Sequence, residues 1–577
     1  MPETEDKEQS TKDKEPSTTM PVRQRKWVAY ALLLLAAFSF RFTVALALPN
    51  DNPEDGRVYS QMARNLLEQH VYSHAKAPPY QPSLIRLPGY SIFVAAIYSA
   101  CGHGNNTAVR IVHTLLDTLT CALVAMIAYY WEPAAKRKRA ASLAALALAA
   151  VCPFTTIYVA TVLTETWASL FAVGLCLLAT MALLARSFKR SLCWWGTAGL
   201  VGGASVFFRP DSGLFVAAVG LTLVITGLFQ QTGGNGSPSL QRRLFIVVGQ
   251  GVLLSVAFAV VLVPWTVRNW REFHLFQPLS PTHGEMPGEF VPRGYYTWLK
   301  TWVDDRKYTE PVIWSLDESE IDVEQLPAGA FDSPAERARV IALIEQYNDP
   351  PDEEDRATTD QPAATAESTA EAVRSAAPAD SSASAKETPV PAADEHVQSD
   401  SEMRAAEAAP KPVEAPPDLT PALDAAFGQV ARERITRAPL RYYLWLPLKR
   451  ARSLWFGPHA DYYPFAGELF PLSDLDHNTH QHLWLPMFAG LVWIYTWLGF
   501  MGGWRLWRSR EFLSRRWLLL AVLMIALRLA FFSTMENPEP RYTVEIFPLL
   551  AILGGMAIAR LVRVRQTEAE SIAATVV

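Results

Sequence analysis

Two adjacent carboxylates, Glu54 and Asp55, stand just after the first hydrophobic segment of the chain, residues 27–48. This segment is long and apolar enough to cross a bilayer, so the pair emerges at its far interface. The residues that follow, from Tyr59 to Leu67, have the pattern of a helix lying near that interface. A carboxylate in this place can accept a proton from a hydroxyl group. The pair therefore indicates a membrane enzyme that works at one face of the bilayer.

The composition separates the chain into two kinds of segment. Half of its 577 residues are hydrophobic, and several stretches long enough to cross a bilayer are almost wholly apolar. The net charge of −5 averages basic loops against an acidic insert. Basic residues lie in short clusters between the apolar stretches, where membrane topology explains them, so we expect no nucleic-acid partner. The five cysteines form no C-x-x-C pattern, so no zinc or redox motif is present.

The apolar stretches predict an all-α polytopic membrane protein with about ten transmembrane helices. Short basic clusters lie between these stretches and all fall on one side of the membrane, which the positive-inside rule makes cytoplasmic. Both termini are then cytoplasmic, and Asp55 faces outward. The lack of a retention signal and the alanine-rich insert favour the inner (plasma) membrane of a bacterium. In chain order the predicted spans are residues 27–48, 108–130, 140–160, 163–185, 194–208, 212–229, 244–264, 482–502, 516–534 and 543–562.

The spans divide the chain into a cytoplasmic disordered N-terminus, a transmembrane core, a long outer loop, a C-terminal group of helices and a cytoplasmic tail. We expect amphipathic helices in a first outer loop inside the core, residues 49–107. An insert in the second outer loop, residues 350–418, cannot bury enough apolar surface to offset its ordering entropy, so we expect it to be disordered. The boundaries are 1–26, 27–264, 265–481, 482–562 and 563–577.

The ionisable residues in and beside the spans share one depth, although each is costly to keep in a membrane. A transporter that alternates its access would place such groups near the midplane of the bilayer, and no inverted repeat is evident. Snorkelling or structural pairing explains any single residue about as well, but lipid-facing charges have no reason to share one leaflet. All lie in the outer half or in outer turns: Arg41, Asp117, Glu165, Arg209, Asp211, Arg268, Arg528, Glu536 and Arg541.

A series of short motifs resembles the GT-C superfamily of membrane glycosyltransferases. The series looks most like the branch related to protein O-mannosyltransferases and bacterial aminoarabinose transferases, which is glycosyltransferase family 39-like. No single motif is specific, and the resemblance rests on their order together with the topology. It covers residues 27–310 well and 430–562 more loosely. The motifs are Asp55-x-x-x-Tyr59, Arg86-Leu87-Pro88-Gly89-Tyr90, Thr164-Glu165-Thr166, Arg209-Pro210, Pro264-Trp265-x-x-Arg268-Asn269 and Glu536-x-x-x-x-Arg541-Tyr542.

The resemblance implies an enzyme that transfers a sugar, hexose or pentose, from a polyprenyl-phosphate donor to a hydroxyl acceptor at the extracytoplasmic face. Asp55 matches the family's first-loop aspartate and is predicted to be the base that takes the acceptor proton. Tyr59, four residues on, is predicted to contact the substrate. Glu54 is the fallback. The alternative is that Asp55 only caps the helix beginning near Gly56, since Asp is a favoured N-cap residue.

The leaving lipid phosphate needs fixed cations, and Arg86, Arg268 and Arg541 match positions that line such a site in related enzymes. Arg268 could instead be an interfacial anchor after Trp265, and Arg541 could pair with Glu536. Glu165 and Arg209 are predicted to form a structural pair beside the site, and Asp211 is predicted to be a turn residue.

No cofactor is predicted, although a divalent metal ion is a second possibility. Asp51, Glu54 and Asp55 with His283 could bind one, as relatives among the oligosaccharyltransferases do, but the mannosyltransferase branch generally does not. The histidines between residues 477 and 482 fit no defined set of ligands.

Three other functions stay open. The chain could be an oligosaccharide ligase or polymerase that uses larger lipid-linked donors, a flippase for lipid-linked sugars, or a scaffold with a decayed site. The acceptor could be a protein, a lipid or a glycan.

Overall fold

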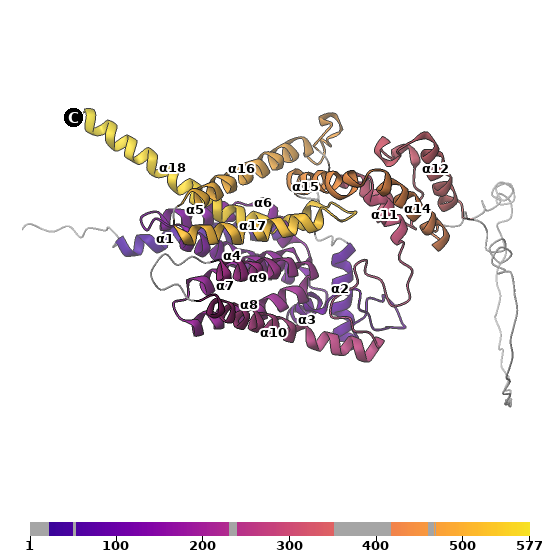
Figure 1. The fold of residues 1–577 in the computed structure, drawn as a ribbon, viewed down its shortest axis with the longest axis horizontal. Helices are drawn as coiled ribbons and strands as arrows, with labels where there is room; N and C mark the ends of the chain where they lie inside the picture. The colour runs from indigo at the N-terminus through magenta and orange to yellow at the C-terminus, as the bar shows by residue number, and fades with distance from the viewer. Residues whose placement is uncertain are drawn as a thin grey trace, which may run out of the picture.

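The structure of the chain is a computed structural model that describes residues 22–49, 54–229, 239–350, 417–459, 467, 469–509 and 511–576. These residues are helical or irregular, with no strand among them, which confirms the predicted all-α class. The longer helices lie side by side in one bundle (Figure 1). They are α1 (Val22–Ala47), α4 (Asn106–Trp131), α5 (Lys138–Ala150), α7 (Glu165–Leu184), α8 (Phe188–Phe208), α9 (Gly213–Leu228), α10 (Leu240–Phe273), α16 (Gln481–Arg508), α17 (Phe512–Phe532) and α18 (Ile546–Val576).

Among the described residues, seven helices are long and apolar enough to cross a membrane, or eight if α5 and residues 153–160, which bend by 48°, form one span. The prediction of ten spans was therefore too high by this measure. Helix α17 contains three arginines, and the apolar part of α18, Ile546–Leu561, is short. Both helices contribute to the buried core of the bundle, for example through Met524 and Ile552. Protein rather than lipid surrounds their core faces, so they tolerate charge and short length.

Several predicted domain boundaries fall inside helices. Helix α1 begins at Val22 rather than at residue 27, α10 continues to Phe273 and α18 to Val576. The predicted disordered insert, residues 350–418, lies almost wholly outside the described residues, as does most of the predicted N-terminal segment.

The predicted amphipathic helices of the first outer loop are present as α2 (Glu54–Glu68) and α3 (Pro88–Cys101). They lie at one end of the bundle, and α11 (Arg293–Lys300), α12 (Pro334–Asn348) and α14 (Pro421–Arg437) form a smaller unit beyond that end (Figure 1). This unit has its own core, which includes Trp298, Val340 and Phe427. Helix α15 (Leu446–Phe456) leads from it back towards α16 and α17. This end of the bundle is therefore covered by helices from both predicted outer loops.

Candidate active site

Asp55 lies in the first turn of α2, one residue after the helix begins at Glu54. The buried side of α2 includes Met62 and Asn65, and the Asn65 side chain donates hydrogen bonds to the carbonyls of Ser73 and Ala75. These bonds fix the following loop against the helix. Because the helix has already begun at Asp55, the alternative that Asp55 is only its N-cap does not describe the structure.

Two arginines from distant parts of the chain hold the Asp55 carboxylate. Arg86 donates to Oδ1 at 2.9 Å, and Arg541, 486 residues away, donates to Oδ2 at 3.1 Å. Burial raises the pKa of Asp55, but the charges of Arg541 and Arg86 outweigh it, so the pKa lies below its ordinary value. The side chain remains 31% exposed, so a substrate can reach it. Neighbouring Glu54 is exposed, so the two carboxylates of the pair have different surroundings.

The loop before α3 places Arg86. At Gly89, α3 packs so closely on α8 that a Cβ atom would lie 2.6 Å from the Phe207 carbonyl oxygen. The Tyr72 hydroxyl donates to the carbonyls of Arg86 and Leu87 at 3.2 and 3.1 Å. The packing at Gly89 and the hydrogen bonds from Tyr72 thus fix the position of the backbone at Arg86 relative to α8.

Tyr59 lies one turn after Asp55 and makes an edge contact with Tyr90, with 4.9 Å between the ring centroids. Burial raises its pKa to about 12, so the phenol is neutral at physiological pH. It packs with Ala63 and Val94 in a small hydrophobic cluster below the site. This contact supports α2; a substrate contact by Tyr59 stays a prediction.

Arg268 is separated from the two other predicted phosphate ligands. It donates to the Ser83 carbonyl at 2.8 Å and to the Asn269 side chain at 2.9 Å. Its guanidinium lies over the rings of Trp265 and Phe273, at 4.8 and 5.1 Å from their centroids. These contacts agree with the alternative of an anchor near Trp265. Arg268 thus contacts the loop that carries Arg86, at Ser83, and it makes no contact with Asp55.

The predicted pair of Glu165 and Arg209 is present at 2.8 Å, and it belongs to a larger buried network. Arg209 also pairs with Asp211 at 2.9 Å. Arg528, fully buried on α17, pairs with Asp211 at 2.8 Å and with Glu545 at 2.9 Å. Asp211 is therefore more than a turn residue. The network ties α7 and α8 to α17 and to the segment before α18. That segment carries Arg541.

Arg528→Met is expected to destabilise the protein by about 3–5 kcal/mol, because it removes the nearest cation of the buried Glu545 and leaves Asp211 with Arg209 alone. Thermal unfolding in detergent measures the effect. Arg515→Met makes the same change at an exposed position of α17 and is expected to leave the unfolding temperature nearly unchanged. Equal unfolding temperatures for the two variants would contradict a structural role of the network.

Glu536 does not pair with Arg541, contrary to the alternative drawn from sequence. Arg541 pairs with Asp55 and, at 2.9 Å, with Glu539. Glu536 contacts His283 at 3.4 Å and Lys300 at 3.0 Å. We call Glu536, His283 and Lys300 the Glu536 clasp. Through His283 it connects the loop between α10 and α11, and through Lys300 the end of α11, to the turn that carries Arg541. The sequence offered no sign of it, because its three members lie far apart in the chain.

Glu536→Gln is expected to loosen this loop and to speed tryptic cleavage after Arg293 several-fold at neutral pH. Burial raises the pKa of Glu536, but His283 and Lys300 lower it by more, to about 2. Since folding lowers this pKa, the stabilisation is present at neutral pH and is lost as pH falls from the ordinary glutamate range towards 2. The exposed Glu310 provides the control, because Glu310→Gln should cleave like the wild type. Unchanged cleavage in Glu536→Gln would contradict the clasp.

A metal site gains no support from the geometry. Within the described residues, no group of three or more His, Cys, Asp or Glu side chains is arranged to hold a metal ion. Asp51 lies outside them, and His283 contacts Glu536. The rings of His477 and His482 lie 4.5 Å apart, centroid to centroid, and also form no such group. A metal requirement stays an open prediction.

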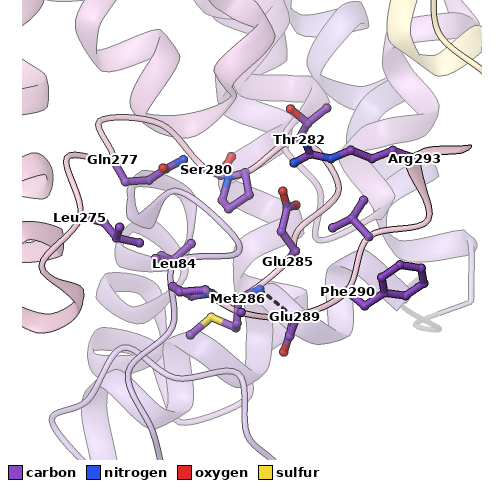
Figure 2. Close-up of a pocket in the computed structure, with 14 residues that line it drawn as sticks. Leu84, Leu275, Gln277, Ser280, Thr282, Glu285, Met286, Glu289, Phe290 and Arg293 are labelled. Atoms are coloured by element: carbon purple, nitrogen blue, oxygen red, sulfur yellow. Dashed lines mark hydrogen bonds between the residues drawn. The ribbon is translucent and has the colours of Figure 1, made fainter. Parts of the chain in front are cut away.

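A cavity of about 580 Å³ lies near Arg86, and it is lined by Leu84 and by most of the residues between Leu275 and Arg293. Figure 2 shows Glu285 between Gln277 on one side and Arg293 on the other. The same loop contacts the site: Gly284, in a left-handed conformation (φ 74°), lies so close to Arg86 that a Cβ atom would be 3.0 Å from its Nη1. Sequence reasoning missed this cavity, because no motif marks the loop.

Comparisons with known proteins add little. No model of a known protein family matches the chain, and no curated protein matches it in sequence. Among solved structures it is similar to ArnT from Cupriavidus metallidurans bound to undecaprenyl phosphate, with 12% identity, a TM-score of 0.35, and coverage of 94% of this chain and 79% of that one. For ArnT in the apo state the values are 14%, 0.34, 92% and 78%. Similarity this low says nothing about the chemistry of this chain.

Proposed function

We propose that this protein is a membrane glycosyltransferase that moves a sugar from a polyprenyl-phosphate donor to a hydroxyl acceptor at the extracytoplasmic face. The observation that carries the proposal is the Asp55 carboxylate held between Arg86 and Arg541 at one end of the helix bundle. A base and two permanent cations in contact are what such a transfer needs, because a proton leaves the acceptor while negative charge grows on the departing phosphate.

In this proposal Arg86 and Arg541 bind first Asp55 and then the phosphate of the donor. In the free protein they neutralise Asp55; when the donor binds, its phosphate competes for the same guanidinium groups, which favour phosphate by geometry. Asp55 then loses its cations and becomes a better proton acceptor. The acceptor oxygen forms a bond with the anomeric carbon, and the bond from that carbon to the phosphate oxygen breaks. The electron pair leaves with the polyprenyl phosphate, and the hydroxyl proton goes to Asp55.

This exchange of partners predicts different pH profiles for kcat/KM and kcat. In the free enzyme the pKa of Asp55 is below its ordinary value, so kcat/KM should show no acid limb from this group between about pH 5 and 8. In the donor complex the arginines face the phosphate, so the acid limb of kcat should lie at higher pH. The reverse order of the two limbs would contradict the exchange.

Turnover of a polyprenyl-phosphate sugar by the purified protein in detergent tests the function itself. A transferase releases free polyprenyl phosphate and gives one added sugar on the acceptor. A ligase or polymerase of larger lipid-linked donors adds oligosaccharide blocks, a flippase leaves the donor unchanged, and a decayed scaffold neither binds nor consumes it. Only the first outcome supports the proposal.

A further inference from the structure

The cavity of residues 275–293 is next to the proposed site but is chemically different from it. Leu84 lines the cavity two residues before Arg86. Gly284, one residue before the lining residue Glu285, lies so close to Arg86 that a Cβ atom there would be 3.0 Å from Nη1. The loop that lines the cavity therefore also comes close to the Asp55–Arg86 pair.

The cavity is a built pocket within an otherwise irregular loop. The Glu285 carboxylate accepts a hydrogen bond from the His283 backbone at 3.0 Å, and the Glu289 carboxylate accepts one from Met286 at 2.6 Å. Near the start of the loop, the Asn269 side chain donates to the Gln277 carbonyl at 2.8 Å. The Glu536 clasp holds the middle of the loop through His283. The volume of the cavity, about 580 Å³, is within the usual range for small-molecule sites.

The lining suits a polyhydroxylated ligand. Neutral hydrogen-bonding side chains and two carboxylates offer partners for hydroxyl groups, and Phe290, 49% exposed, offers a flat apolar surface. Two carboxylates, Glu285 and Glu289, against one guanidinium, Arg293, leave the pocket with a net negative charge. A phosphate group is repelled there, whereas the neighbouring arginines attract one. The neutral polar residues are Gln277, Ser280 and Thr282.

We propose that this pocket is the acceptor subsite and that it takes a saccharide without phosphate, neutral or amino-bearing, next to Asp55. The inference rests on the proposed transferase function and assigns its acceptor class. In this proposal the arginines attract the donor phosphate, and the negatively charged pocket takes the acceptor that has no phosphate.

Ser280→Trp, which fills the pocket, tests the assignment. Calorimetry would measure the binding of three alkyl glycosides to the full chain in nanodiscs: one neutral, one amino-bearing and one phosphorylated. We expect the wild type to bind the neutral or amino glycoside at least tenfold more tightly than the phosphorylated one. Ser280→Trp should weaken that binding at least tenfold. Leu279→Trp adds the same bulk at a neighbouring position, 37% exposed and not in the lining, and should bind as the wild type does.

Binding of a polyprenyl phosphate to each variant shows that it is folded and keeps the donor site. Gln277→Leu, which removes one polar group at similar volume, provides a second variant if Ser280→Trp fails this check. Unchanged glycoside binding in the pocket variants, a preference for the phosphorylated glycoside, or no glycoside binding by the wild type would overturn the subsite. Failure of the proposed function looks different, because the wild type would then bind glycosides but release no polyprenyl phosphate from the donor.

Discussion

Asp55→Asn is expected to reduce release of polyprenyl phosphate from the donor by at least about 10²-fold, the usual contribution of a general base. The amide has the shape of the carboxylate and still offers an oxygen to Arg86 or Arg541, but it cannot take the acceptor proton. It also frees positive charge for the donor phosphate. Binding of a polyprenyl phosphate should therefore stay at the wild-type level or become tighter while turnover is lost. A residue that served only to hold the loops together would not separate the two measurements.

Glu54→Gln is the matched control for this variant. It removes the same charge one residue away, at an exposed position in the same helical turn. We expect its turnover to stay within about twofold of the wild type, as for most exposed substitutions. Full turnover by Asp55→Asn, or equal losses of turnover in both variants, would contradict the assignment of Asp55 as the base.

Arg541→Gln is expected to cause the second large loss, about 10- to 100-fold in affinity for a polyprenyl phosphate, since a hydrogen bond to a charged group is worth about 1.5–3 kcal/mol. Turnover falls further, because the remaining cation must serve both Asp55 and the leaving phosphate. Arg541→Lys keeps the charge but loses the planar fork, so an intermediate loss is expected. Titration with polyprenyl phosphate and steady-state turnover measure the two effects separately.

Arg268→Gln is the comparison that tests the geometry. Arg268 carries the same charge near the same interface, but it donates to the Ser83 carbonyl rather than to Asp55. We expect its loss of phosphate affinity to be several-fold smaller than that of Arg541→Gln. If Arg268→Gln were the more damaging change, the phosphate site would lie over Trp265 and not beside Asp55.

The sequence alone predicted an all-α chain of long apolar helices, and it predicted that the ionisable residues of the candidate site share one layer. Long apolar runs and the position of charged residues within them are local properties, because a bilayer-crossing helix satisfies its own backbone and needs about 20 apolar residues. The order of motifs singled out Asp55, Arg86 and Arg541, which the structure brings into contact. Glu165 and Arg209 were also paired correctly, since Glu165 stands at the start of α7 and Arg209 at the end of α8.

Only the tertiary structure decided which charge meets which. Arg268 and Arg541 look alike in sequence, yet one lies over Trp265 and the other reaches across 486 residues to Asp55. Glu536 pairs with Lys300 and His283 rather than with Arg541, which is nearer in the sequence. Glu545, which no sequence motif marked, belongs to the buried network. Nor did the sequence show that α17 and α18 lie within the core, where a helix need not be long or uncharged. The physical reason is common to all of these: partners and surroundings depend on how distant segments pack, and no local pattern of residue types records that packing.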